Sequence, residues 1–114
     1  MTIYEGGENI VLARIVRLSE AAAADIIEQA DWYEEKSDSK LAERWSKAVT
    51  SAVLRILRNP QSGGPCRFNP TELHGIRRIR ISGFPKHLVF YSVLENDVLI
   101  LRVLHGARDL ESLF

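Results

Sequence analysis

The stretch from Ile76 to Arg108 constrains the fold of this chain more than any other. Its sequence, IRRIRISGFPKHLVFYSVLENDVLILRVLHGAR, contains three runs rich in β-branched and aromatic residues, separated by turn-forming residues. Such runs predict three strands, at Ile76–Ser82, Lys86–Leu94 and Val98–His105. Because the links between them are short, the three strands should form an antiparallel meander.

The two links also predict the register of the meander. A three-residue loop at 95–97 places Leu94 opposite Val98, and a three-residue loop at 83–85 carries the same alternation into the first strand. One face is then apolar, with Ile79, Ile81, Val89, Tyr91, Val93, Leu99, Leu101 and Val103. The other face is mixed, with Arg78, Arg80, Leu88, Phe90, Arg102 and Leu104.

The mixed face has two interpretations. Its arginines are either solvated side chains on the open side of a one-sided sheet or ligands for an anionic partner. The apolar residues between them should not stay in contact with water, because exposed apolar patches mark interaction sites. We therefore expect the C-terminal tail or a second chain to cover this face.

Two amphipathic helices precede the meander. Ser19 is a favourable N-cap for a helix that ends near Lys36, and a second helix over 40–58 stops at Asn59 and Pro60. Their short link predicts a helical hairpin, whose apolar side is the natural cover for the apolar sheet face. The apolar stripes are Ala23, Ile26, Ile27, Ala30 and Tyr33 in the first helix and Leu41, Trp45, Ala48, Val49, Ala52, Val53 and Ile56 in the second.

Three further side chains are candidates for function. Trp32 falls on the polar side of the first helix, where it either contacts a partner or folds over the edge of its own helix. His87 and His105 come to lie opposite each other, either for acid–base chemistry or as part of the rim of the core. The three histidines lie on separate elements and neither CxxC nor HExxH occurs, so we expect no metal and no other cofactor.

Composition places the chain among soluble globular domains. With 114 residues, 46% hydrophobic and 26% charged, it has room for one core. We expect a single domain at 13–114 behind a flexible extension at 1–12. A lone cysteine, Cys66, rules out an intramolecular disulfide and is expected to be a passive thiol. Neither a membrane span nor a signal peptide is apparent, so a cytoplasmic location is expected.

The formal net charge of zero conceals an uneven distribution. Residues 1–39 carry nine acidic and three basic side chains, residues 40–88 carry two and ten, and residues 89–114 carry four and two. The basic middle suits either an anionic partner or the acidic first helix of the same chain.

Three segments together resemble the ParE/RelE superfamily of toxins from bacterial type II toxin–antitoxin systems. They are LSEAAAADI with the following DWYEE, the strand pair GIRRIRISGFPKHLVFYSV, and LILRVLHGARD. The resemblance covers about residue 13 to the C-terminus. It implies a compact α+β fold in the order β-α-α-β-β-β, with the helical hairpin on one face of a mainly antiparallel sheet. It also implies a cognate antitoxin that wraps the toxin.

One branch of this superfamily consists of endoribonucleases. RelE-like members cleave mRNA on the ribosome with a set of basic residues, which Arg78, Arg80 and Arg108 match by position. His87 or His105 would then carry protons. The set is damaged at two points: the arginine of the middle strand is missing at residues 87 and 88, and a phenylalanine at residue 114 stands nearest to the place of the tail tyrosine. A phenyl ring cannot transfer a proton.

The other branch acts by binding. ParE-like members bind and poison DNA gyrase, and the RVLHGARD end resembles them most. We therefore predict a ParE-like toxin that arrests growth and stabilises plasmids, with the RelE-like endoribonuclease and a toxin fold without toxicity as alternatives. The partner-binding residues expected on the first hypothesis are Trp32, Arg78, Arg80, Leu88, Phe90, Arg102, Leu104 and Arg108.

Overall fold

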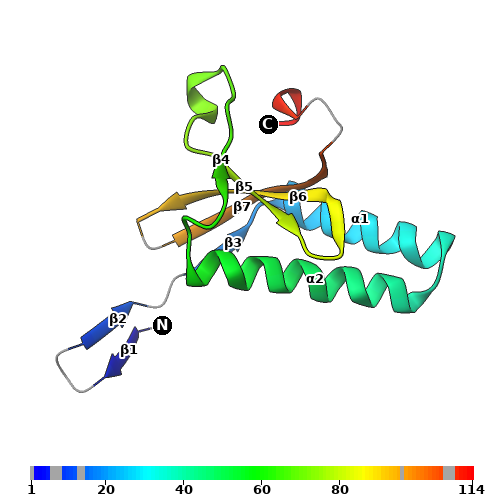
Figure 1. Cartoon of the computed structure of the whole chain (residues 1–114), viewed down its shortest axis with the longest axis horizontal. Helices are drawn as coiled ribbons and strands as arrows, with labels where there is room; N and C mark the ends of the chain where they lie inside the picture. Colours follow the sequence, from blue (N-terminus) through cyan, green and yellow to red (C-terminus); the bar gives the residue numbers. More distant parts are fainter. Residues whose placement is uncertain (1, 6–8, 13–14, 96, 107–109) are drawn as a thin grey trace.

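The fold consists of two helices packed on one face of a five-stranded sheet. The computed structural model describes residues 2–5, 9–12, 15–95, 97–106 and 110–114. Helices α1 (Glu20–Lys36) and α2 (Ser39–Arg58) pack against each other, and in Figure 1 α2 runs below the sheet while α1 extends to its right. The strand order is β3-β7-β6-β5-β4, formed by Val16–Leu18, Asp97–His105, Phe84–Leu94, Arg77–Ile81 and Gly64–Pro65. β3 is parallel to β7 and the other pairs are antiparallel, which confirms the predicted α+β fold.

Four short elements complete the structure. β1 (Thr2–Glu5) and β2 (Asn9–Leu12) form an antiparallel hairpin of their own, which stands apart from the five-stranded sheet in Figure 1. It lies within residues 1–12, which were expected to form a flexible extension. The 3₁₀ turns η1 (Thr71–Leu73) and η2 (Glu111–Leu113) lie on the side of the sheet opposite the helices. Within the described ranges, no helix is long and apolar enough to cross a membrane.

Both helices begin at the capping residues that the sequence provides. The hydroxyl of Ser19 accepts a hydrogen bond from the Ala22 N–H at 2.9 Å, and the Asp38 carboxylate accepts one from the Leu41 N–H at 2.8 Å. Ser19 also donates to the carbonyl oxygen of Leu101 at 2.7 Å. The start of α1 is therefore tied directly to strand β7.

The main core lies between the helices and the sheet. Its fully buried side chains include Trp45 and Ile56 from α2, and the Trp45 indole N–H donates to the carbonyl of Ile26 in α1 at 3.0 Å. The apolar stripe of α1 differs from the prediction at one position: Ile27 is 59% exposed, and Ala22 is buried instead. Residue 22 lies four positions before Ile26 and shares its face of the helix. Residue 27 is the next residue around the helix and points away from that face.

Strands β5 and β6 pair in the predicted register over residues 77–80 of β5. The turn between them is tighter than predicted, because Ile81 pairs with Phe84 and leaves a two-residue link. Gly83 in this link has a φ of +85°, which a residue with a side chain rarely adopts. An irregularity in the ladder after Arg80 compensates for the shorter turn.

Strand β7 keeps the predicted register with β6 for only part of its length. Val89 pairs with Val103 as predicted, but Tyr91 pairs with Ile100 rather than with Leu101. Leu101 is therefore the extra residue of a β-bulge. Its carbonyl oxygen is the one that binds the Ser19 hydroxyl, so the bulge has a hydrogen-bond partner in α1's cap.

In the part of β7 before Arg102, the bulge reverses which residues point toward the helices. Val98 and Ile100 are fully buried in the core between the sheet and the helices, where Leu99 and Leu101 were expected. That prediction is wrong, because it assumed an uninterrupted ladder. Leu101 packs instead on the opposite face of the sheet.

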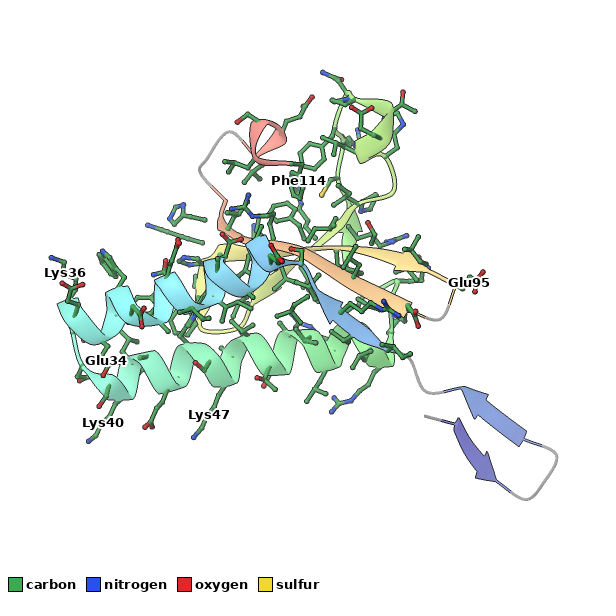
Figure 2. The ribbon with its side chains drawn as sticks, turned by 180° about the vertical axis from the view of Figure 1, so that it is seen from behind. Glu34, Lys36, Lys40, Lys47, Glu95 and Phe114 are labelled. Atoms are coloured by element: carbon green, nitrogen blue, oxygen red, sulfur yellow. The ribbon has the colours of Figure 1, made fainter. Side chains whose placement is uncertain are left out.

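Part of the mixed face of the sheet is covered by the chain itself, while Arg78 and Arg80 on the same face remain exposed. A second core, consisting of Ile76, Phe90 and Leu104, is buried beneath the loop at 66–73 and the C-terminal residues. The ring of Phe114 lies 5.4 Å from the rings of both Phe68 and Phe90, and Figure 2 shows it directed toward the sheet. Either the C-terminal tail or a second chain was expected to cover this face. In the structure the C-terminal tail packs on it, together with the loop at 66–73.

Candidate binding site

A basic cavity lies on the sheet beside strand β5, the N-terminal part of β6 and the C-terminal end of β7. It encloses about 630 Å³ and is lined by Gly64, Arg78, Arg80, Pro85, Lys86, Leu88, His105 and Gly106. Alternation along β5 places Arg78 and Arg80 on the face away from the helices, and both are exposed. None of these lining residues is acidic, so the cavity, as far as the described chain forms it, favours an anion. Lys86 was not singled out from the sequence, because a lone lysine next to a proline carries no motif.

The two histidines lie opposite each other, as predicted. His87 pairs with His105 across β6 and β7, and their rings are 5.3 Å apart. His87 also packs against the Trp45 ring at 4.9 Å. Burial, and to a smaller extent His105, lowers the pKa of His87, so this imidazole is neutral at pH 7. His105 lines the basic cavity, whereas His87 does not.

A second cavity lies on the other side of His105, between α1 and the sheet. It encloses about 480 Å³ and is lined by Asp25, Glu28, Gln29, Trp32, Tyr33, His87, Val103, Leu104 and His105. Trp32 is 53% exposed at this cavity, which agrees with its predicted place on the polar side of α1. We call this cavity the α1 cavity.

Arg102 does not project from an open face. Its guanidinium donates to both oxygens of Asp25, with both distances 2.8 Å, and to the carbonyl of Leu113 at 2.8 Å. The hydrogen bond to Asp25 is the main reason why the pKa of Arg102 is raised. Arg102 is therefore already occupied by groups of its own chain. Nothing local in the sequence indicates this pair, because its members are 77 positions apart.

The other predicted contact residues are divided among separate surroundings. Leu88 is half-buried and lines the basic cavity, and Leu104 is buried in the second core and also lines the α1 cavity. Phe90 is fully buried beneath the tail. Arg108 lies outside the described residues. The structure thus brings together Arg78, Arg80 and Leu88 at the basic cavity, whereas Trp32, Phe90, Arg102 and Leu104 lie in other surroundings.

Cys66 is the one cysteine of the sequence, and it is half-buried. Burial raises the pKa of the Cys66 thiol and outweighs the opposite effect of Arg78, so the thiol is protonated at pH 7. No cluster of three His, Cys, Asp or Glu side chains suited to a metal ion occurs in the part of the chain that is described.

Comparison with known proteins identifies the family. Residues 16–110 match the model of a family described as the ParE toxin of the type II toxin–antitoxin system, parDE. A solved structure of a chromosomal ParDE toxin–antitoxin system from P. aeruginosa is similar, with a TM-score of 0.66 and 18% identity over 82% of this chain and 96% of that chain. A structure of a YafQ mutant from E. coli has a TM-score of 0.48 and 13% identity over 89% of this chain and 98% of that chain. No curated protein matches the sequence. The chain belongs to the ParE family of toxins from type II toxin–antitoxin systems.

Proposed function

We propose that this toxin binds and inhibits DNA gyrase in the cytoplasm without catalysing a reaction, and that a cognate antitoxin neutralises it. The observation that carries the proposal is the match of residues 16–110 to the ParE family. Gyrase binding is the activity that the sequence resemblance attaches to ParE-like members. Growth arrest would follow from the loss of supercoiling.

The arrangement of the possible proton carriers supports a binding function. Cleavage of RNA requires one group to remove a proton and another to deliver one, on either side of a phosphate held by cations. His105 lines the basic cavity, but His87 packs against Trp45. Phe114 packs in the second core and has no hydroxyl. The described lining thus offers one imidazole for two proton transfers.

One observation favours the RelE-like endoribonuclease as a second candidate. Arg78, Arg80, Lys86 and His105 line a single cavity, as a phosphate-binding site with one proton carrier would require. In this alternative the ribosome and its mRNA are the target. A toxin fold that has lost its toxicity is the third candidate, and it predicts harmless overexpression.

The first experiment compares two targets of the same purified protein. Gyrase with relaxed plasmid and ATP should lose supercoiling activity as the toxin is added, and cells that express the toxin without its antitoxin should stop growing. Ribosome-bound transcripts should remain intact in those cells. Normal supercoiling together with cleaved transcripts would reject the proposal in favour of the endoribonuclease.

A pair of charge-matched variants separates the candidates further. The Arg78→Ala/Arg80→Ala variant removes two cations from the basic cavity, and Lys40→Ala/Lys47→Ala removes two exposed cations from α2, where Figure 2 labels them. An endoribonuclease should lose at least about 100-fold in cleavage with the first variant and little with the second. Full toxicity of the first variant would exclude RNA cleavage in this cavity.

A further inference from the structure

We infer that the α1 cavity receives an arginine side chain of the cognate antitoxin, held between the ring of Trp32 and the carboxylate of Glu28. The inference rests on the proposed function in one respect, the existence of an antitoxin that binds this toxin. It adds the place of contact and the chemistry of the contacting residue.

Trp32 provides an exposed aromatic surface in a fixed position. Its ring meets the ring of Tyr33 edge-on, with centroids 5.7 Å apart and planes at 75°, while 53% of the residue remains exposed. Both residues line the α1 cavity. Exposed tryptophan at a cavity is a preferred anchor of protein interfaces, and indole is the side chain that attracts a cation most strongly.

The carboxylates of the α1 cavity differ in what they already bind. Asp25 is occupied by Arg102 and by the N–H of Val103, the latter at 2.9 Å. Glu28 is exposed and, after the hydrogen bond to Asp25, its charge contributes to the raised pKa of Arg102, but the salt bridge of Arg102 is formed with Asp25. Glu28 precedes Trp32 by four positions, so the two side chains are neighbours on one face of α1. A carboxylate and an indole are thus presented together.

The charge around the cavity selects a cation. The α1 segment 20–36 contains six acidic residues and one lysine. No lysine or arginine is among the residues that line the cavity in the described chain. His87 has a lowered pKa because of burial and His105, so it adds no positive charge at pH 7. A phosphate-bearing partner would be repelled here, and it would be attracted to the basic cavity on the other side of His105.

The shape of the site favours arginine over lysine. A planar guanidinium can stack on an indole ring and still direct N–H donors to a carboxylate, which a lysine ammonium cannot do in the same way. The cavity of about 480 Å³ has room for a long side chain. The antitoxin is the partner that the family of this chain implies, which is why we assign the arginine to it.

The decisive measurement is the affinity of purified toxin variants for the small protein encoded by the neighbouring reading frame, by isothermal titration calorimetry. Trp32→Ala should weaken binding about 5- to 30-fold, and Glu28→Gln about 3- to 10-fold. Glu35→Gln is the matched control, because it removes an exposed carboxylate of the same helix that does not line the cavity. Its affinity should stay within about twofold of the wild type.

A small-molecule probe tests the chemistry without the antitoxin. Nα-acetyl-arginine amide should shift the indole N–H resonance of Trp32, while the resonance of Trp45, whose indole N–H is bonded to Ile26, should stay in place. The neutral isostere Nα-acetyl-citrulline amide should shift neither resonance. Equal shifts with both compounds would overturn the assignment of a cation.

The outcomes distinguish this inference from the proposed function. A tight wild-type complex that both cavity variants leave unchanged would reject the inference and leave the toxin–antitoxin assignment intact. Failure of the wild-type proteins to form any complex would reject the neutralisation that we propose, and the inference with it. Unchanged antitoxin affinity with weaker gyrase inhibition by Trp32→Ala would assign the cavity to the target and overturn the inference.

Discussion

Asp25 in α1 and Arg102 in β7 form an ion pair in which each carboxylate oxygen accepts one hydrogen bond from the guanidinium, both at 2.8 Å. The side chains are 10% and 20% exposed, so water screens the pair only weakly. The same carboxylate accepts the N–H of Val103, and the same guanidinium donates to the carbonyl of Leu113. One pair thus joins a helix, a strand and the C-terminal turn.

Replacing Asp25 by Asn should lower the free energy of unfolding by about 2–3 kcal/mol. The change leaves the Arg102 guanidinium partly buried without its counter-charge, which costs more than the lost hydrogen bonds. Urea denaturation followed by circular dichroism measures the effect. Glu35→Gln, an exposed change on the same helix, should alter stability by less than about 0.5 kcal/mol. Equal effects of the two substitutions would contradict the role of the pair.

Gly63→Ala should destabilise the protein by about 1–3 kcal/mol, while Gly64→Ala should be nearly neutral. A Cβ atom at residue 63 would lie 2.5 Å from the Tyr91 hydroxyl oxygen and 2.6 Å from the Arg78 carbonyl oxygen, whereas one at residue 64 meets nothing within 4 Å. The Tyr91 hydroxyl cannot easily move away, since it accepts from the Gly63 N–H and donates to the Pro60 carbonyl. The melting temperatures of the two variants, measured by thermal unfolding, should differ accordingly.

Stability should fall as the pH drops below about 6.5, the pKa of histidine in an unfolded chain. Burial, followed by His105, lowers the pKa of His87 in the folded state. Between the lowered folded pKa and the unfolded pKa the unfolded chain binds more protons, so acid favours unfolding. Urea denaturation at pH 7.5 and 5.5 should show a smaller loss for His87→Gln than for the wild type. The exposed His74→Gln variant should behave like the wild type, and a wild-type curve independent of pH would sink this explanation.

Phe114→Ala should cost about 1–3 kcal/mol and expose the sheet face beneath the tail. The Phe114 ring packs on Phe68 and Phe90 but is only half-buried, so the loss should be below that of a core phenylalanine. Increased fluorescence of a dye that binds apolar surface would report the uncovered Phe90. Leu94→Ala, at a position that is 61% exposed, should change neither stability nor dye binding.

Local signals were sufficient for the two helices and the three strands of the meander. Ser19 and Asp38 cap the helices that follow them, because a short polar side chain can reach a free N–H within its own first turn. The apolar spacing of α2 predicted buried Trp45, Val49 and Ile56, since a period of 3.6 residues marks one face of a helix whatever it packs against. The family resemblance, too, depends on these segments and is confirmed.

The register of β7 could not be obtained from the sequence. Residues 98–101 are Val, Leu, Ile and Leu, so either alternation gives an apolar face toward the helices. Packing against the helices selected Val98 and Ile100, with a bulge at Leu101 that the Ser19 hydroxyl stabilises. A uniformly apolar strand carries no information about which side is inward.

By itself, the sequence determined the two helices, the three strands of the meander, the arginine-bearing side of β5 and the place of Trp32 on the polar side of α1, because each of these depends on neighbours within a few positions. Only the tertiary structure decided that Arg102 is bound by Asp25, that the tail covers Phe90, and that Trp32 and Glu28 share a cavity with two histidines from the sheet. These relationships join residues far apart in the chain. The free energy that such contacts contribute to folding depends on burial and on distances that exist only after the helices have packed on the sheet.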